Sequence, residues 1–565
     1  MNSQKGSKYT ITAALFLSIL ALAGCRGGDQ ASGDGNFAAP QQNQTGADFP
    51  VPAPNINLAA PLVVSQKPED VELCAKINRK IEESPYANAR WGVFAVSLKD
   101  GRVVCSRDGR KLFNPASIQK TLTAAVALDK LGPDFRWRTS VYAAGPIEAD
   151  GTLNGDLVLY GQGAPDFGTA ELENLVAQLE QKGLRRVRGR IVGDQSYFRG
   201  DNIGDGWTWN ELQWWYGAEA SALSFNDNVA FINVENGAGR ASNDYVQVTM
   251  AANAPEEKNV ETETAGIKRG LSDNHFYVWG SQKNFGSKVA VYNPAGLAAK
   301  SFREALEKKG VAIEGETVSR DWKAAEQFDP AAAVELAFVE SAPLAEIVKK
   351  MNKHSVNLHA ELILRTLGKK FGDTVPEDIQ QPQNVRGDDT AGAAVMKKWL
   401  LDRNIAAGEV AIADGSGLSR LDFVTPESFA RALIFAAQSP SAQAFTDSLP
   451  IAATDGTLGG RLGKVKGRVL AKTGSIMFVN SLAGYADHAG GEVYAFAVIT
   501  NNDTRRGGAV ALIDQIVTML VTGAVDEKED AANKTANKAA NGQPNSNADE
   551  NANRPNFVLE RQAKN

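Results

Sequence analysis

A serine and a lysine at neighbouring helical positions are the residues of this chain with the clearest capacity for chemistry. Ser117-Ile118-Gln119-Lys120 is the only Ser-X-X-Lys tetrad in the sequence. Residues at this spacing share one face of a helix, so the Lys120 amine can reach the Ser117 hydroxyl. A serine hydroxyl is a poor nucleophile at neutral pH, and the pair can therefore perform acyl transfer only if Lys120 is neutral part of the time. The alternative for two such common residues is an ordinary surface pair.

The residues around the tetrad predict the helix that must position it. Asn114-Pro115-Ala116 supplies an N-cap residue, a proline suited to the first helical position and a strong helix former. The run 121–128 continues the helix, which places Ser117 in its first turn. A helix N-terminus favours negative charge at that point, and burial or a second cation would lower the pKa of Lys120.

A second motif offers groups that bind a carboxylate. Lys472-Thr473-Gly474-Ser475 contains the only Lys-Thr-Gly of the chain, and it ends a predicted strand. Glycine at that point lets a substrate backbone approach closely, while the lysine and threonine side chains are hydrogen-bond donors. The alternative interpretation is a plain turn at the end of a strand.

A third motif is weaker by itself and depends on its place in the chain. Ser355-Val356-Asn357 lies inside the predicted helical stretch 343–368, between the tetrad and the Lys-Thr-Gly motif. Two other triplets, Ser224-Phe225-Asn226 and Ser272-Asp273-Asn274, also read Ser-X-Asn. Both lie where turns are predicted, so Ser355 is the favoured candidate.

Elements near both ends of the folded part predict one α/β domain that is split in the sequence. A helical pattern over 71–81 is followed by strands at 91–98 and 103–105, which an Asp-Gly hairpin joins. The later part supplies three strands and a closing helix, at 468–472, 481–486, 493–500 and 509–521. The chain between the halves has short strands and frequent glycines, as in 155–161 and 188–194. We therefore expect the domain at 68–137 and 333–524, interrupted by a β-rich insertion at 138–332.

The N-terminus has the pattern of an exported lipoprotein. Lys5 and Lys8 precede an apolar stretch at 11–23 that is too short for a mature membrane span and ends in Leu22-Ala23-Gly24-Cys25. The resemblance to bacterial lipoproteins implies removal of residues 1–24 and lipidation of Cys25; a plain signal peptide is the alternative. Arg26 after Cys25 favours the outer membrane, on the periplasmic side. We expect a flexible tether at 25–67 and a disordered tail at 525–565.

Cysteine number and charge limit the remaining possibilities. The chain has three cysteines, and a lipidated Cys25 would leave Cys74 and Cys105 to form a disulfide in an oxidising compartment, with two buried free thiols as the alternative. The formal net charge of −6 favours no nucleic-acid partner. No cofactor is expected, because no spaced cluster of His, Cys and carboxylate residues indicates a metal site.

The order Ser-X-X-Lys, Ser-X-Asn, Lys-Thr-Gly resembles the penicilloyl serine transferase superfamily, which includes penicillin-binding proteins and serine β-lactamases. The long separation of Ser117 from Ser355, with the segments 216–228 and 414–420, resembles the class C low-molecular-mass penicillin-binding proteins, the D-alanyl-D-alanine carboxypeptidase/endopeptidase family. The resemblance covers about residues 70 to 520. It implies an α/β (α+β) serine β-lactamase/transpeptidase-like domain with a five-stranded antiparallel sheet and helices on both faces.

The same resemblance implies a role for each motif residue. Ser117 would be the acylated nucleophile and Lys120 its base; Ser355 would relay a proton to the leaving amine, and Asn357 would hold Lys120 and the substrate amide. The strand motif, Lys472, Thr473, Gly474 and Ser475, would bind the substrate, and backbone N–H groups of Ser117 and Ser475 would form the oxyanion hole. Cationic Lys472 would lower the pKa of Lys120. The implied substrates are peptidoglycan stem peptides and cross-links, with β-lactam antibiotics as covalent inhibitors.

Three other functions were weighed against this one. A Ser-His-Asp hydrolase is disfavoured, because the sequence has no Gly-X-Ser-X-Gly elbow and only four histidines, His275, His354, His359 and His488. His354 and His359 flank the Ser-X-Asn motif but do not share a helical face, so surface or packing roles are favoured. A serine β-lactamase would need a positioned base for fast deacylation, which is not apparent. A non-catalytic wall-binding lipoprotein is disfavoured by the three intact motifs.

Overall fold

The computed structural model describes residues 49–251, 265–376, 387–505 and 508–523. Cys25, the predicted signal peptide and the tail from residue 525 lie outside the described residues. The described end of the predicted tether, 49–67, packs against the folded chain: Arg431 donates to the Leu58 carbonyl at 2.7 Å and Gln438 to the Pro54 carbonyl at 3.0 Å. The prediction of a flexible tether is therefore wrong for residues 49–67. Side chains from elsewhere in the fold hydrogen-bond to backbone carbonyls of this segment and hold it in place, although its sequence has no helical or strand periodicity.

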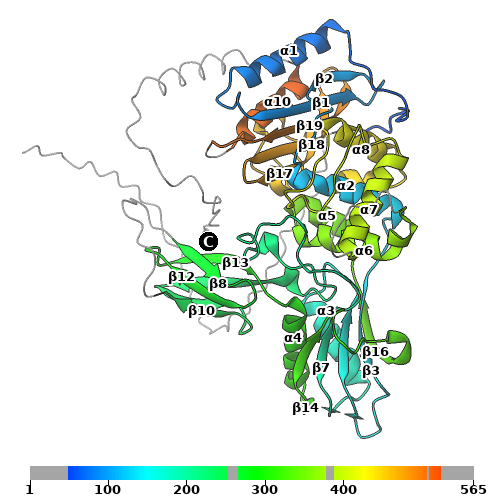
Figure 1. The fold of residues 1–565 in the computed structure, drawn as a ribbon, viewed down its shortest axis with the longest axis vertical. Coiled ribbons are helices and arrows are strands. Elements are labelled where there is room, and N and C mark those ends of the chain that lie inside the picture. Colours follow the sequence, from blue (N-terminus) through cyan, green and yellow to red (C-terminus); the bar gives the residue numbers. More distant parts are fainter. Residues whose placement is uncertain (1–48, 252–264, 377–386, 506–507, 524–565) are drawn as a thin grey trace, which may run out of the picture. The chain divides into compact units, whose positions relative to one another are not determined.

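A five-stranded antiparallel sheet is the centre of the domain that holds the tetrad (Figure 1). Its strand order is β17-β18-β19-β1-β2. The early and late parts of the chain meet where β1 pairs with β19, with Trp91 opposite Thr500. The strands are β1 (Arg90–Ser97), β2 (Val103–Arg107), β17 (Val469–Ile476), β18 (Val479–His488) and β19 (Glu492–Asn501). The predicted sheet, assembled from two early and three late strands, is confirmed.

Helices cover both faces of this sheet because successive strand residues point to opposite sides. Trp91 and Val93 of β1 join the apolar cluster formed with α1 (Pro68–Glu82) and α10 (Val510–Thr522). Phe94 and Val96 join the larger core, to which the remaining helices contribute. These helices are α2 (Gln119–Lys130), α5 (Leu344–His354), α6 (Asn357–Phe371), α7 (Asp388–Asp402), α8 (Pro426–Gln438) and α9 (Ala442–Ser448). Burial on both faces makes this sheet the rigid support of the tetrad.

The described residues between α2 and α5 form further sheets and two α-helices. A mixed five-stranded sheet has the order β15-β7-β5-β3-β16. Its strands are β3 (Arg138–Ala143), β5 (Leu157–Gly161), β7 (Ile191–Asp194), β15 (Thr317–Arg320) and β16 (Val334–Glu340), beside a small sheet of β4 (Thr152–Leu153), β6 (Arg186–Val187) and β14 (Ala312–Ile313). Two three-stranded sheets contain β8 (Val229–Glu235), β9 (Ala238–Ala241) and β13 (Phe285–Ala290), and β10 (Gln247–Met250), β11 (Gly266–Arg269) and β12 (His275–Trp279).

The insertion differs from the expected β-rich segment in two respects. It contains α3 (Thr169–Gln181) and α4 (Pro294–Lys308), whose apolar faces are buried although frequent glycines dominate the surrounding sequence. Strand β16 pairs with β3, so the sheet of the insertion continues through Glu340, past the expected boundary at residue 332. A boundary placed by amino-acid composition misses β16, because the sequence of this strand would suit a strand of either domain.

A disulfide joins Cys74 of α1 to Cys105 of β2. It fixes the first helix to the edge strand that lies furthest from β17 in the sheet order. Among the described residues, no helix combines the length and apolar character required to cross a bilayer.

Candidate active site

Ser117 lies in a short 3-10 turn, η1 (Ala116–Ile118), immediately before α2. The predicted first α-helical turn therefore begins later, at Gln119. Ala116 has φ of +50°, a conformation that L residues rarely adopt, and the Asn114 side chain holds it by accepting from the Ala116 N–H at 3.1 Å. Asn114 also donates to the Ser419 carbonyl at 2.9 Å. This network presents a partly exposed Ser117 side chain at the start of a buried helix.

Lys120 is fully buried and makes three polar contacts. Its Nζ lies 3.0 Å from Ser117 Oγ, 2.5 Å from Asn357 Oδ1 and 2.7 Å from the Ser416 carbonyl oxygen. An ammonium has three donors and a neutral amine has two donors and one lone pair. The neutral form can therefore donate to Asn357 and Ser416 while its lone pair accepts a proton from Ser117.

Burial lowers the pKa of Lys120 to about 7, although the carboxylates of Asp414, Glu361 and Asp422 act in the opposite direction. Of the two predicted causes, burial is confirmed and cationic Lys472 is corrected, because the charged groups that act on Lys120 are these carboxylates, which raise its pKa. Lys472 instead has its own pKa lowered, first by burial and then by Lys120.

The Ser-X-Asn motif connects two helices rather than lying within one. Ser355 ends α5 with φ of +57°, and Asn357 is the first residue of α6. The single helix predicted over 343–368 is therefore wrong, because the left-handed conformation at Ser355 turns the chain. This turn directs Asn357 Oδ1 to Lys120 and leaves Asn357 Nδ2 to donate to the Tyr216 carbonyl at 2.8 Å.

Strand β17 forms the other wall of the site. Lys472 is fully buried, and its Nζ lies 2.9 Å from Ser355 Oγ. Thr473 Oγ1 donates to Thr457 Oγ1 at 2.8 Å, while Ser475 is exposed at the outer edge. A Cβ atom on Gly474 would lie 2.2 Å from Ser481 Oγ and 2.9 Å from the Ser117 backbone N. Only glycine at this point lets β17 come this close to the backbone of Ser117.

The loop 414–420 supplies contacts that the sequence motifs do not reveal. Buried Asp414 accepts from the backbone N–H groups of Ser416, Gly417 and Ser419, at 3.1, 2.6 and 2.9 Å. These bonds fix the Ser416 carbonyl that accepts from Lys120. The glycines and serines of this loop are its only sequence signal, because a backbone carbonyl has no residue type of its own.

The loop also joins the insertion to the site. Trp207 Nε1, from the insertion, donates to Asp414 Oδ2 at 2.8 Å. The Tyr216 carbonyl, also from the insertion, accepts from Asn357. Neither of these two positioning contacts was found from the sequence.

The second Ser-X-Asn triplet and the histidines named below lie apart from this cluster. Ser224 bonds to the Ser221 carbonyl in a local turn. His359 is buried and lies 3.1 Å from Asp227 Oδ1; burial disfavours ionised Asp227, but His359 and Lys350 lower its pKa to about 2. His275 contacts Thr249, and His488 contacts the Leu520 carbonyl. Within the described ranges, no group of at least three His, Cys, Asp or Glu side chains is placed to hold a metal ion.

Comparisons with known proteins identify relatives over most of the chain. A D-alanyl-D-alanine carboxypeptidase of Actinomadura sp. (strain R39) is 31% identical over 457 residues, covering 76% of this chain and 81% of the relative. The D-alanyl-D-alanine carboxypeptidase DacB of Haemophilus influenzae is 28% identical over 427 residues, covering 73% and 85%.

Two solved structures are similar to this chain and belong to the same class of protein as these relatives. The crystal structure of penicillin binding protein 4 (dacB) from Haemophilus influenzae matches with a TM-score of 0.65 and 27% identity, covering 79% of this chain and 97% of that one. The same protein complexed with a β-lactam matches with a TM-score of 0.62 and 25% identity, with the same coverage. Residues 73–522 match the family described as D-Ala-D-Ala carboxypeptidase 3 (S13). The chain belongs to this family.

Proposed function

We propose that this protein is a serine D-Ala-D-Ala carboxypeptidase that removes the terminal D-Ala of peptidoglycan stem peptides through an ester on Ser117. Family membership supports the reaction class. The observation that supports the residue assignment is the 3.0 Å separation of Lys120 Nζ from Ser117 Oγ, with Lys120 buried and its pKa lowered to about 7. A lysine in this state is a base matched to neutral pH.

Acylation begins when neutral Lys120 takes the proton of the Ser117 hydroxyl. Ser117 Oγ then attacks the carbonyl carbon of the penultimate D-Ala, and the C–N bond to the terminal D-Ala breaks. The proton gained by Lys120 replaces the one that Ser355 passes to the leaving nitrogen, so Ser355 keeps its hydroxyl and Lys120 is neutral again. Lys472, 2.9 Å away, donates toward Ser355 Oγ and so orients its O–H outward. Water later attacks the ester, Lys120 accepts the proton of the water, and this proton passes to Ser117 Oγ as the ester bond breaks.

Strand β17 binds the substrate and its developing charge. Lys472 and Thr473 hold the C-terminal carboxylate of the substrate, and Asn357 holds its amide. The backbone N–H groups of Ser117 and Ser475 stabilise the oxyanion, and Gly474 permits the close approach of their two backbones. Removal of one such donor typically costs about 3 to 4 kcal/mol of transition-state stabilisation.

Two extensions use the same chemistry. A cross-link also joins the carbonyl of a D-Ala to an amine, so endopeptidase cleavage requires only that the cleft admit the longer leaving group. A β-lactam acylates Ser117 in the same way and leaves slowly; a relative complexed with a β-lactam supports this assignment.

We further infer that the protein is exported as a lipoprotein. Lys5, Lys8 and the apolar stretch 11–23 before Cys25 support a signal peptide at 1–24 and lipidation of Cys25, with the periplasmic side of the outer membrane favoured by Arg26. Radiolabelled palmitate should enter the wild type and not Cys25→Ala. Recovery of the protein in the inner membrane fraction would contradict the outer-membrane assignment.

Fluorescent penicillin tests the residue assignment. The wild type should form a stable covalent adduct, and Ser117→Ala should form none. Ser475→Ala is the matched control, because the oxyanion donor at that position is a backbone group and labelling should persist. An adduct that survives in Ser117→Ala would disprove the assignment. Mass analysis of digested muropeptides then separates loss of terminal D-Ala from cleavage of cross-links.

A further inference from the structure

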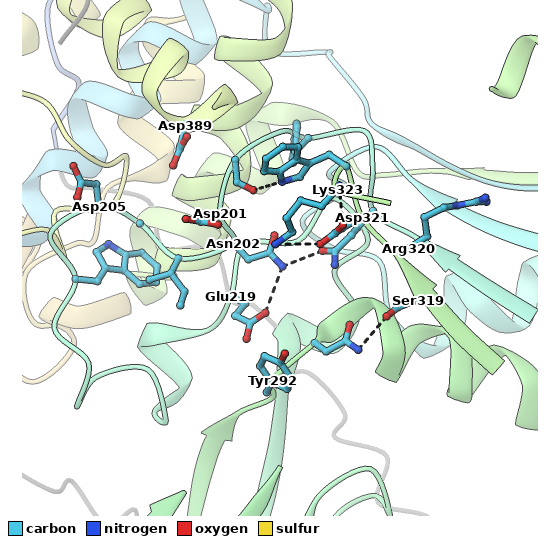
Figure 2. A pocket seen from close by; sticks show the side chains of 18 of the residues that line it. Asp201, Asn202, Asp205, Glu219, Tyr292, Ser319, Arg320, Asp321, Lys323 and Asp389 are labelled. Atoms are coloured by element: carbon cyan, nitrogen blue, oxygen red, sulfur yellow. Dashed lines mark hydrogen bonds and ion pairs between the residues drawn. The ribbon is translucent and has the colours of Figure 1, made fainter. Parts of the chain in front are cut away.

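A cavity of about 1010 Å³ lies in the insertion (Figure 2). It is lined by the segment from Gln195 to Trp207, by Glu219, and by residues 292–293 and 319–324, with Asp389 of α7. No described residue that lines it belongs to the three motifs of the candidate active site. Pockets for small ligands typically measure about 300 to 1,000 Å³, so this cavity has room for several linked ring-sized units.

Side-chain amides in the cavity are held in fixed orientations. Asn202 Nδ2 donates to Gln195 Oε1 at 3.0 Å and to Glu219 Oε2 at 3.4 Å, and Figure 2 shows Asn202 between Glu219 and the Asp321–Lys323 pair. Asn293 Nδ2 donates to Ser319 Oγ at 3.0 Å. These bonds leave Asn202 Oδ1 and Gln195 Nε2 available, whereas Asn293 Oδ1 already accepts from the Gly296 N–H at 3.2 Å.

The available side of Gln195 has no protein partner in the part of the chain that the structure describes. Gln195 is 8% exposed and lines the cavity, and among the described residues its Nε2 donates to no protein acceptor, while Asn202 Oδ1 accepts from no protein donor. Neither atom is fully enclosed by protein, so both can bond to water or to an occupant. The cavity thus presents a fixed donor and a fixed acceptor to an occupant.

Three carboxylates of the cavity lining or its edge form ion pairs, whereas Asp201 lines the cavity without an ion pair among the described residues. Asp321 pairs with Lys323 at 3.3 Å, Arg320 with Asp194 at 2.5 Å, and Asp389 with Arg365 at 3.6 Å. Burial raises the pKa of Glu219 and so favours its neutral form. A lining of amides and paired charges, with Asp201 as an added acidic group, suits a polar, uncharged ligand better than an anionic one.

We propose that this cavity binds a neutral oligosaccharide of N-acetylated amino sugars, the glycan chain that carries the stem peptides. The proposal rests on the proposed function, because that function supplies a substrate attached to such a glycan. Amide groups match the hydroxyl and acetamido groups of these sugars, and Tyr292 and Trp322 give the lining apolar surface for the sugar rings.

The position of the cavity suits a glycan attached to the reacting peptide. Trp207 lines the cavity and donates to Asp414, and the Gly206 carbonyl accepts from the Arg420 N–H at 3.2 Å. One loop of the insertion therefore touches the cavity and the loop that carries Ser416. A bound glycan would hold its stem peptide near Ser117 and raise its effective concentration there.

Calorimetry with chitotetraose and the full-length protein tests the proposal, together with kcat/KM for a glycan-linked stem peptide and for the same peptide without sugar. We expect chitotetraose to bind, and the glycan-linked substrate to be cleaved with the higher kcat/KM. Gln195→Ala and Tyr292→Ala should each weaken binding about tenfold, as loss of one hydrogen bond or ring contact implies. Tyr277→Ala, an exposed tyrosine on β12, is the matched control and should bind like the wild type.

Penicillin labelling in the same variants separates this proposal from the proposed function. Normal labelling and normal cleavage of the sugar-free peptide, with reduced binding of chitotetraose, support the cavity assignment. Normal labelling without binding of chitotetraose to the wild type, or equal binding by all variants, overturns it. Displacement of bound probe by a cationic stem peptide alone would assign the cavity to the peptide and also overturn it. Absence of labelling in the wild type overturns the proposed function instead.

Discussion

Two buried lysines face each other across the candidate active site, and the walls that hold them differ in charge. Burial lowers the pKa of Lys120, while Asp414, Glu361 and Asp422 raise it and leave it at about 7. Around Lys472, the charges of Lys120 and Arg461 act in the same direction as burial and lower the pKa well below its ordinary value. The comparison teaches that loss of hydration lowers the pKa of both amines, and that neighbouring charges oppose this lowering at Lys120 and add to it at Lys472.

This difference assigns the two lysines different tasks. A neutral Lys120 with carboxylates behind it is a proton acceptor near neutral pH. Lys472 lacks such compensation, so under the proposed function we expect the C-terminal carboxylate of a substrate to favour its charged form. A charged Lys472 would in turn disfavour protonation of the neutral Lys120 amine. We therefore expect binding of the carboxylate and activation of Ser117 to be linked.

Removal of the base should give the largest effect. Lys120→Met should lower kcat/KM for a peptide ending in D-Ala-D-Ala by about 10³ to 10⁴-fold, because no other described group is bonded to the Ser117 hydroxyl. Lys120→Arg should be as inactive, since guanidinium does not lose its proton. Lys349→Met, on the partly exposed side of α5, is the control. Substantial activity in Lys120→Arg would show that a neutral amine is not required.

Lys472 should matter most when the substrate has a carboxylate. Lys472→Met should lower kcat/KM about 100-fold for a peptide with a free C-terminus, an effect typical of losing a charged hydrogen bond. For the same peptide with an amidated C-terminus, the wild type should already be slow, and the substitution should change its rate little. Equal losses of kcat/KM on the two substrates would contradict the different roles assigned to Lys120 and Lys472.

The pH dependence of kcat/KM should report the protonation of Lys120, whose pKa the neighbouring carboxylates raise. Lys120 accepts a proton only when neutral, so kcat/KM should fall about tenfold per pH unit below its pKa of about 7 and level off above it. Burial raises the pKa of Glu361 to about 8, so this carboxyl is only partly charged at the Lys120 midpoint. Glu361→Gln removes that partial charge, and the midpoint should move slightly to lower pH. Glu346→Gln, exposed on α5, should leave the profile unchanged. A midpoint that moves to higher pH in Glu361→Gln would contradict the role of the carboxylates.

The smallest effect on activity is expected far from both walls. Cys74→Ala combined with Cys105→Ala should lower the free energy of unfolding by about 3.5 kcal/mol, as the chain-entropy model gives for a loop of this length. Activity should change less than about twofold, because the disulfide lies at β2, the sheet edge opposite β17. Denaturant unfolding and peptide hydrolysis measure the two quantities. A large loss of activity at full folding would show that this edge influences the site.

The sequence allowed the central sheet and the motif side chains to be predicted, because residue types and strand patterns specify them directly. It did not reveal Ser416 or Tyr216, whose contribution is a backbone carbonyl. The turn at Ser355 was hidden because a left-handed conformation leaves no pattern in a helical stretch. Helices α3 and α4 were missed among glycines. Burial was one of two causes expected to lower the Lys120 pKa, but only the three-dimensional structure shows that burial, rather than Lys472, supplies the lowering.

Two hydrogen bonds, from Trp207 to Asp414 and from Asn357 to the Tyr216 carbonyl, join the insertion to the rest of the site. A minimal enzyme made by deleting the insertion would keep all three motifs and the complete central sheet. It would nevertheless lose one partner of the loop behind Lys120 and one partner of Asn357. The inserted segment is thus part of the frame that sets the catalytic geometry, and transplanting the motifs alone into a smaller scaffold would not transfer the activity.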